Sequence, residues 1–301
     1  MQLGKVFLLA LFGCVLINSQ QPPSTLQPSK AIALLKPSIV QISIAYRFTV
    51  AGRPVPIMGV RPLGSGFFAD TDGHVFTNEH VTKLFHRFPN AVAEDVAKTG
   101  QQWDPASLHA DLTIGIPISS QNIVHISGSF DQLPATILAE DQASDVAILT
   151  PRVNPFKGGS LPIVVNGKAL PLPAVKVPLF TSPQPVDGEM IATSGFPLSI
   201  TSLVTTIGWL SSVWFPAPQR ELYDRTHWGD MWYLGDLKVN HGNSGGPVYR
   251  VKDGSVIGIA EAFVEAPLEN PTGLNLKENS GLAVIVPIKF ALDLLHKKAG
   301  S

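Results

Sequence analysis

A loop near residue 244 contains the residues best suited to nucleophilic chemistry. It reads Asn-His-Gly-Asn-Ser-Gly-Gly-Pro over residues 240–247. A serine hydroxyl needs a base to attack at neutral pH, and the oxyanion that forms needs N–H groups aimed at it. Glycines allow the tight turn that points several N–H groups into one hollow. The loop therefore predicts Ser244 as a nucleophile and an oxyanion hole at Gly242, Asn243 and Ser244; the alternative is an ordinary glycine-rich turn.

A base and an acid that could activate Ser244 lie far upstream. His80 follows a strand-like run in Thr-Asn-Glu-His-Val, and Asp145 directly precedes the apolar stretch Val-Ala-Ile-Leu. A carboxylate held under an imidazole fixes its tautomer and stabilises the imidazolium that forms during attack. We therefore predict a triad of His80, Asp145 and Ser244. The other histidines compete with His80, and Asp111 and Asp141 compete with Asp145.

The pattern of strands and turns predicts an all-β protein. Short runs rich in β-branched residues, separated by turn residues, are typical of barrels and sandwiches. A first series of strands is expected at 38–46, 66–70, 74–77, 112–118, 123–127, 135–139 and 146–150. A second series is expected at 190–194, 201–214, 234–238, 247–250, 256–264 and 281–285. With helices at 29–36 and 287–298, the prediction is two β-barrels, a short N-terminal helix and a C-terminal helix.

The two series of strands divide the chain. Residues 37–150 are predicted to form the first barrel, with the base, the acid and a partly helical insertion around 82–110. Residues 151–187 contain many prolines, which cannot donate to a central strand, so we expect a connection with isolated edge strands. Residues 188–301 are predicted to form the second barrel, with the nucleophile, and the C-terminal helix.

The first residues predict export. Lys5 and the apolar run from Val6 to Ile17 are followed by polar residues, a pattern typical of a cleaved signal peptide at 1–19. The run is shorter than the roughly 20 residues of a membrane span, and no later segment qualifies, so we expect no transmembrane span in the mature chain. Residues 20–36 then form a spacer and the short helix. We expect a periplasmic or secreted protein, with a lipid anchor on Cys14 as the alternative.

Charge and spacing argue against several other classes. Lys plus Arg (22) nearly cancels Asp plus Glu (23), and no long like-charge run occurs, so nothing indicates a nucleic-acid partner. No histidine or cysteine spacing matches a metal site, and no glycine-rich loop has the setting of a nucleotide site. We expect no metal and no cofactor, and protein or peptide substrates as partners.

Together the motifs resemble the trypsin-like serine peptidases, and within them the HtrA/Deg type. Four segments match in the family's order: residues 64–81, 139–149, 188–197 and 241–249. The resemblance implies His80 as general base, Asp145 as its orienting partner and Ser244 as nucleophile, in a cleft between two barrels. It implies a serine endopeptidase that cuts unfolded or exposed protein segments through an acyl-enzyme.

Two predictions concern the pocket for the substrate side chain. By resemblance to the HtrA type, Val239, Ala262 and Phe263 line a small apolar pocket, which implies cleavage after small or medium aliphatic residues. Lys238 lies near the position where trypsin-like peptidases have the floor of this pocket, and a buried lysine there would favour acidic side chains. Because lysine is rarely buried, we expect Lys238 to point outward.

One departure from the family's pattern motivates another function. Glu79 stands beside His80 where the family usually has a small residue; it adds a charge if it faces the site and does nothing if it faces solvent. The alternative function is a protease-like binding or chaperone module with little or no turnover. An esterase ranks last, because the serine lies in GNSGG rather than in a GxSxG elbow.

Aromatic residues gather before the nucleophile loop: Trp209, Trp214, Tyr223, Trp228, Trp232 and Tyr233. Such residues could form a rim that grips substrate or a contact in a homo-oligomer, although aromatic residues on strands are more often core. The chain ends at Ser301, shortly after the expected helix, so the resemblance implies a form without the PDZ domain common in HtrA proteins.

Overall fold

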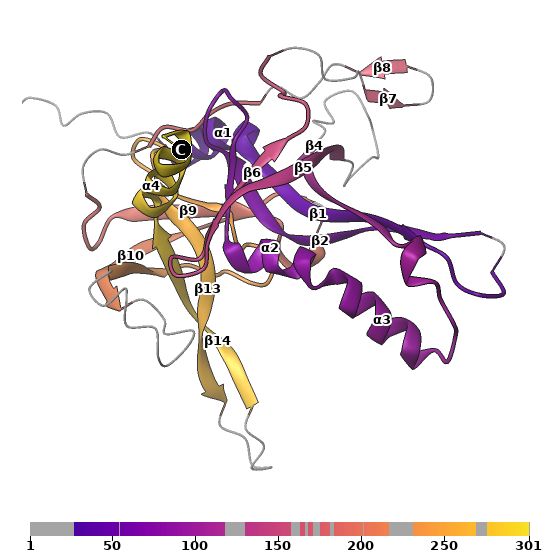
Figure 1. Cartoon of the computed structure of the whole chain (residues 1–301). Coiled ribbons are helices and arrows are strands. Elements are labelled where there is room, and N and C mark those ends of the chain that lie inside the picture. Colours follow the sequence, from indigo (N-terminus) through magenta and orange to yellow (C-terminus); the bar gives the residue numbers. More distant parts are fainter. Residues whose placement is uncertain are drawn as a thin grey trace, which may run out of the picture.

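Two closed, six-stranded, antiparallel β-barrels form the molecule (Figure 1), which confirms the predicted fold class. This computed structural model describes residues 27–53, 55–117, 130–157, 163–165, 168–170, 175–180, 184–200, 202–216, 231–268 and 276–300. The predicted signal peptide with Cys14 and the expected strand at 123–127 lie outside these residues. No helix in the described ranges reaches the length and hydrophobicity that a membrane crossing requires.

The first barrel has the strand order β1-β2-β3-β6-β5-β4. Its strands are β1 (Ile39–Phe48), β2 (Ile57–Phe68), β3 (Val75–Thr77), β4 (His109–Pro117), β5 (Phe130–Asp141) and β6 (Val146–Pro151). Branched side chains fill its interior, among them the fully buried Val40, Ile42, Ile114 and Leu149. The β-branched runs in the sequence therefore predict the inside of this barrel.

The second barrel has the order β10-β11-β14-β13-β12-β9. Its strands are β9 (Met190–Gly195), β10 (Val204–Pro216), β11 (Met231–Asp236), β12 (Pro247–Arg250), β13 (Val256–Leu268) and β14 (Leu276–Pro287). The short η3 (Pro197–Ser199) follows β9, and the nucleophile loop joins β11 to β12. The first barrel thus carries His80 and Asp145 of the predicted triad, and the second carries Ser244.

Helices close the ends of the fold. α1 (Pro28–Leu35) and η1 (Lys36–Ser38) precede the first barrel, and α4 (Ile288–Ala299) follows the second. α4 contacts β5 and β6 of the first barrel and β13 and β14 of the second, so it bridges the two. Between the barrels, β7 (Ile163–Val165) and β8 (Lys168–Leu170) form a separate two-stranded sheet, in keeping with the isolated strands expected in the proline-rich connection.

The insertion after His80 is helical and has its own small core. It contains α2 (Glu79–His86), α3 (Phe88–Lys98) and η2 (Pro105–Ser107), and Figure 1 shows the two α-helices beside the long β1–β2 hairpin. Phe88, Val92 and Val96 of α3 pack with Phe48 and Val50 from the end of that hairpin. The helix is therefore a cover for the hairpin's apolar face.

The aromatic residues before the nucleophile loop separate into two groups. Trp232 and Tyr233 are core residues, 2% and 7% exposed, whereas Trp209 and Trp214 are 49% and 72% exposed. Tyr223 and Trp228 lie outside the described residues. The core interpretation therefore applies to Trp232 and Tyr233, whereas a rim or an oligomer contact at Trp209 and Trp214 stays a prediction.

A core shared by the barrels fixes how they face each other. Phe67 and Phe76 of the first barrel pack edge to face, with ring centroids 5.9 Å apart, and belong to one buried cluster with Phe196 and Tyr249 of the second. Aromatic side chains bury a large apolar area, so this cluster contributes strongly to stability. It lies directly behind the predicted site.

Replacing Phe76 by alanine tests this shared core. Phe76 is fully buried, so Phe76→Ala should reduce the free energy of unfolding by about 3–5 kcal/mol. Trp214→Ala, which removes an aromatic ring that is 72% exposed, should change it by less than about 0.5 kcal/mol. Urea unfolding followed by circular dichroism measures both, and equal effects would contradict the packing described.

Candidate active site

The nucleophile loop takes a shape that only glycine allows at two positions. Gly242 and Gly245 have φ angles of 99° and 88°, in the left-handed region that L side chains rarely adopt. A Cβ atom would also collide with the Phe196 carbonyl at the first position and with the Ser65 carbonyl at the second. The glycines on either side of Ser244 are thus required by the turn and by close contact with neighbouring backbone.

The turn leaves two N–H groups beside Ser244 available. Asn243 is buried, its N–H donates to the Asn240 carbonyl (3.0 Å), and its carbonyl accepts from Gly246 (2.9 Å). In the described part of the chain, the N–H groups of Gly242 and Ser244 donate to no other group. Such a pair of free donors flanking a serine is suited to hold an oxyanion.

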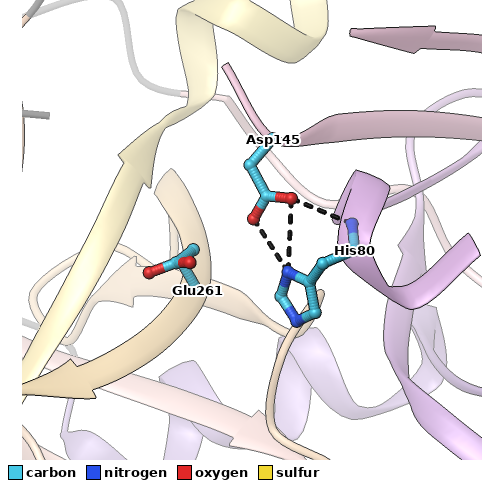
Figure 2. A group of neighbouring side chains, drawn as sticks. All are labelled: His80, Asp145 and Glu261. Atoms are coloured by element: carbon cyan, nitrogen blue, oxygen red, sulfur yellow. Dashed lines mark hydrogen bonds and ion pairs between the residues drawn. The ribbon is translucent and has the colours of Figure 1, made fainter. Parts of the chain in front are cut away.

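His80 and Asp145 form the predicted pair. The Nδ1–H of His80 donates to the Asp145 carboxylate, 2.9 Å from Oδ2 and 3.2 Å from Oδ1, and the backbone N–H of His80 donates to Oδ1 (2.9 Å). The Asp145 side chain is fully buried, whereas that of His80 is 29% exposed. The carboxylate thus holds both the ring and the backbone of His80 in the first turn of α2 (Figure 2).

Asp145 is held in an unusual backbone conformation. Its φ of 54° lies in the left-handed region, which costs most residues about 1–2 kcal/mol and which aspartate tolerates better than most. The side-chain amide of Asn78 donates to its carbonyl (2.9 Å) and stabilises the turn before β6. Asn78 and His80 therefore both contact Asp145, which explains why they stand two residues apart.

The competing residues have other partners. Asp141 accepts a hydrogen bond from the Ser144 hydroxyl (2.6 Å), and Asp111 is paired with Arg152 at the surface. His74 is paired with Asp70 and His86 with Glu140. Of the candidate aspartates, Asp145 is the one that the structure places against His80.

Ser244 faces the same cavity as His80 but has another hydrogen-bond partner. Both line a cavity of about 370 Å³. Within the described residues, the Ser244 hydroxyl donates to the backbone carbonyl of Glu261 on β13 (2.8 Å) and not to the imidazole. The structure thus brings His80, with Asp145 bonded to it, and Ser244 to one cavity, with the serine side chain turned toward β13.

The residues that line this cavity show whether Lys238 is one of them. Val239, Ala260, Ala262 and Phe263 line it, and they include the three residues predicted to form an apolar pocket. Lys238 is exposed and is not among the lining residues. Because successive strand-like residues alternate in direction, the buried Leu237 and Val239 turn the lysine between them outward. The outward direction expected for Lys238 thus agrees with its exposure, and the assignment of residues to a substrate pocket stays a prediction.

Glu79 faces neither solvent nor the cavity, the two positions considered for it. It is only 9% exposed, so it does not face solvent, and it is not among the residues that line the cavity. Its Oε2 atom is buried without a hydrogen-bond partner in the described structure. Its position at the start of α2 favours a negative charge, since the positive end of the helix dipole lies there.

Ser65 is a site residue that the sequence analysis missed. Its hydroxyl donates to the Gly242 carbonyl (2.6 Å) and accepts from the Phe196 N–H (3.0 Å). Its backbone N–H donates to the Ser244 carbonyl (2.8 Å), and its carbonyl accepts from the Thr77 hydroxyl (2.8 Å). One buried serine on β2 thus ties the nucleophile loop of the second barrel to the first. The signal in the sequence was only its place between Gly64 and Gly66.

Glu261 was missed as well. It is 6% exposed, and a carboxylate oxygen of Glu261, a ring nitrogen of His80 and a carboxylate oxygen of Asp145 all lie within 4.8 Å of one another. Figure 2 shows that the three residues come from three separate elements. A histidine with two carboxylates could also hold a divalent cation. Within an apolar strand pattern, one glutamate gave no indication of this position.

Tyr249 anchors the strand that follows the nucleophile. It is fully buried on β12, and its hydroxyl lies 2.9 Å from the Ser194 hydroxyl on β9. Burial raises the pKa of Tyr249, so the phenol stays neutral in this position. The strand that begins after Ser244 is therefore fixed by a neutral hydrogen-bond network in the core.

With this geometry established, comparison with known proteins places the chain. The family model described as "Trypsin-like peptidase domain" matches residues 64–259, which include Ser65, His80, Asp145 and Ser244. The chain belongs to the trypsin-like peptidase family. This confirms the resemblance drawn from the four sequence segments.

The curated relatives of this trypsin-like peptidase chain include HtrA-type proteins. It is 27% identical over 233 residues to serine protease HTRA1 of Xenopus laevis, covering 77% of this chain and 37% of that protein. It is 28% identical over 236 residues to the "probable periplasmic serine endoprotease DegP-like" of Pseudomonas putida (strain GB-1), covering 78% and 34%. The chain thus spans about a third of the length of the curated relatives it matches.

A solved structure supports the same fold. The HtrA-type protease AlgW with a decapeptide matches this trypsin-like peptidase chain with a TM-score of 0.55 and 16% sequence identity, over 91% of this chain and 68% of that one. At this identity the likeness concerns the fold. It agrees with the two closed barrels described above.

Removing the Ser65 hydroxyl tests the link between the barrels. Ser65→Ala leaves the Gly242 carbonyl and the buried Phe196 N–H without their partner, so the free energy of unfolding should fall by about 1–3 kcal/mol. Urea unfolding measures the loss. Ser211→Ala, at an exposed position on β10, is the matched control and should change the value by less than about 0.5 kcal/mol. Equal values for the two variants would refute the role of Ser65.

Proposed function

We propose that this chain is an exported serine endopeptidase that cuts unfolded or exposed protein segments through an acyl-enzyme. The observation that carries the proposal is one cavity lined by both His80 and Ser244, with Asp145 buried against the imidazole. Membership of the trypsin-like peptidase family supports it. The AlgW structure, which contains a decapeptide, supports peptides as the substrate class.

Attack on the peptide bond begins with the proton of Ser244. The hydroxyl rotates from the Glu261 carbonyl toward His80, whose Nε2 accepts the proton while Oγ forms a bond to the carbonyl carbon of the substrate. The Asp145 carboxylate keeps the other ring nitrogen protonated and stabilises the imidazolium. The pair thus turns a weak nucleophile into an effective one.

The negative charge on the substrate oxygen requires donors that are already in place. The N–H groups of Gly242 and Ser244 have the freedom to bind it, and the Ser65 hydroxyl holds the Gly242 carbonyl so that the turn keeps this shape. His80 then gives its proton to the leaving amine as the C–N bond breaks. In the second half of the reaction water attacks the acyl-enzyme, with His80 as its base, and His80 then returns the proton to Ser244. Asn243 shapes the hole without donating to it, because its own N–H is used inside the turn.

The cavity supports a preference for aliphatic side chains before the cut bond. Val239, Ala262 and Phe263 provide apolar walls, and His241 packs on Phe263 with ring centroids 5.6 Å apart, which narrows the space. An apolar cavity of this kind favours side chains that bury without hydrogen-bond partners. Small and medium aliphatic residues satisfy this condition.

Export is part of the proposal. It rests on the signal-peptide pattern at residues 1–19 and on the relative named as periplasmic. A periplasmic or secreted protein follows from cleavage of that segment, and a lipid anchor follows if Cys14 is the modified residue. A homo-oligomer is proposed from the exposed Trp209 and Trp214 on β10.

Casein hydrolysis tests the nucleophile. Wild-type protein from Gln20 onward should release peptides, and Ser244→Ala should lower the rate at least about a thousandfold, because it removes the hydroxyl that forms the proposed acyl-enzyme. The exposed Ser211 supplies the control, Ser211→Ala, which should retain the wild-type rate. Peptide release is measured by mass spectrometry. Turnover by Ser244→Ala at the wild-type rate would exclude Ser244 as nucleophile.

A binding or chaperone module is the second candidate function. The observation that favours it is the hydrogen bond from Ser244 to Glu261, which keeps the hydroxyl away from His80. Such a module would bind unfolded casein equally well as wild type and as Ser244→Ala, with no turnover by either. The hydrolysis experiment therefore separates the two functions.

Cut-site preference tests the pocket. Phe263→Ala enlarges the cavity, so cleavage after larger apolar residues should rise about tenfold relative to cleavage after valine or alanine. Lys238→Ala changes an exposed side chain that does not line the cavity and should leave the preference unchanged. Sequencing of the released peptides gives both preferences. A change with Lys238→Ala alone would show that the pocket lies elsewhere.

A further inference from the structure

Glu261 lies next to Ser244 and next to the pair of His80 and Asp145. Its backbone carbonyl accepts the hydrogen bond of the Ser244 hydroxyl at 2.8 Å. Its carboxylate belongs to the group in which donor atoms of His80, Asp145 and Glu261 lie within 4.8 Å of one another (Figure 2). A single residue on β13 thus lies next to the nucleophile by its backbone and next to the base by its side chain.

Burial of the two carboxylates strengthens their interaction with a nearby charge. Asp145 is fully buried and Glu261 is 6% exposed. Charges interact more strongly in such surroundings than in water, because less solvent screens them. A positive charge that forms on the imidazole is attracted by a negative charge on either carboxylate.

We propose that Glu261 is a second carboxylate that positions and stabilises His80 during attack, beside Asp145. The inference rests on the proposed function, because it needs His80 to become an imidazolium. The Glu261 carbonyl holds the Ser244 hydroxyl in its resting position, and its carboxylate stabilises the state reached once that hydroxyl has given up its proton. Glu261 is a positioning residue, since its side chain acts through His80.

The effect is larger in the transition state than before it. Before attack the imidazole faces the two carboxylates. During attack the Oγ–H bond of Ser244 breaks, the proton joins Nε2 of His80, and an electron pair of Oγ forms the bond to the substrate carbon. The π electrons of the carbonyl bond move to its oxygen, which becomes the oxyanion. The new positive charge on the ring is attracted by both Asp145 and Glu261, so their interaction with it grows as the reaction proceeds.

Other charged or titratable groups at the site are placed differently. Glu265 and His241 also line the cavity, but Glu265 is exposed on the same strand, where solvent screens its charge. Glu79 is buried at the start of α2 but does not line the cavity. Besides Asp145, Glu261 is therefore the buried carboxylate grouped with His80 in the described residues.

Glu261→Gln tests the proposal, because it keeps the size and the backbone carbonyl and removes only the charge. With a peptide taken from a casein cut site, kcat should fall at least about tenfold while KM stays within about twofold. Glu261→Asp, which retains the charge, should recover part of the loss in kcat. A variant that merely weakened folding would not separate kcat from KM in this way, nor would aspartate restore kcat.

Glu140→Gln is the matched control. It makes the same chemical change on β5, where the carboxylate pairs with His86 outside the cavity, and it should retain the wild-type kcat. Circular dichroism checks that each variant folds. If glutamine at position 261 prevents folding, Glu261→Ser replaces it as the neutral partner in the comparison with Glu261→Asp.

The outcomes distinguish this inference from the proposed function. A wild-type protein that cuts, together with neutral variants at position 261 that keep its kcat, would overturn the role of Glu261 and leave the peptidase standing. Equal losses in kcat for the neutral and the aspartate variants would also overturn it, since charge would not matter. A folded wild type that cuts nothing would refute the proposed function, and the inference about Glu261 with it.

Discussion

The hydrogen bonds of Ser65 connect the two barrels at the point where the proposed chemistry takes place. Ser65 belongs to β2 of the first barrel, yet its hydroxyl and N–H bind the carbonyls of Gly242 and Ser244 in the second. These hydrogen bonds help to fix the position of the nucleophile loop relative to the first barrel, which carries His80. The shared core of Phe67, Phe76 and Phe196 brings the barrels together, and the serine defines how the loop faces the base.

The position of the two carboxylates near His80 depends on how the barrels are aligned. Asp145 is buried in the first barrel and Glu261 in the second, and His80 lies within reach of both only because the barrels are held in register. The Ser244 hydroxyl is turned toward β13, and the proposed mechanism requires it to rotate toward His80. In the described structure, the N–H groups of Gly242 and Ser244 donate to no other group and remain available for an oxyanion.

Local sequence patterns predict those features of the fold that depend on a few neighbouring residues. The β-branched runs indicate the strands, and the glycines around Ser244 indicate a tight turn, since both follow from backbone sterics. The long hairpin is different: Gly59, Pro62 and Gly64 interrupt the pattern of β2, so only its last residues were expected as a strand. Ser65 and Glu261 are invisible to such reasoning, because their roles arise from contacts across the barrels. The outward direction of Lys238 could be predicted because lysine is rarely buried.

The identity of the residue that reacts with a fluorophosphonate tests the central claim most directly, namely that Ser244 is activated by His80 and Asp145 across the barrel interface. Peptide mapping by mass spectrometry of the labelled, folded chain should find one adduct, on Ser244, and His80→Ala should abolish it at the same reagent concentration. An adduct on another residue, or labelling of Ser244 that persists in His80→Ala, would contradict the account.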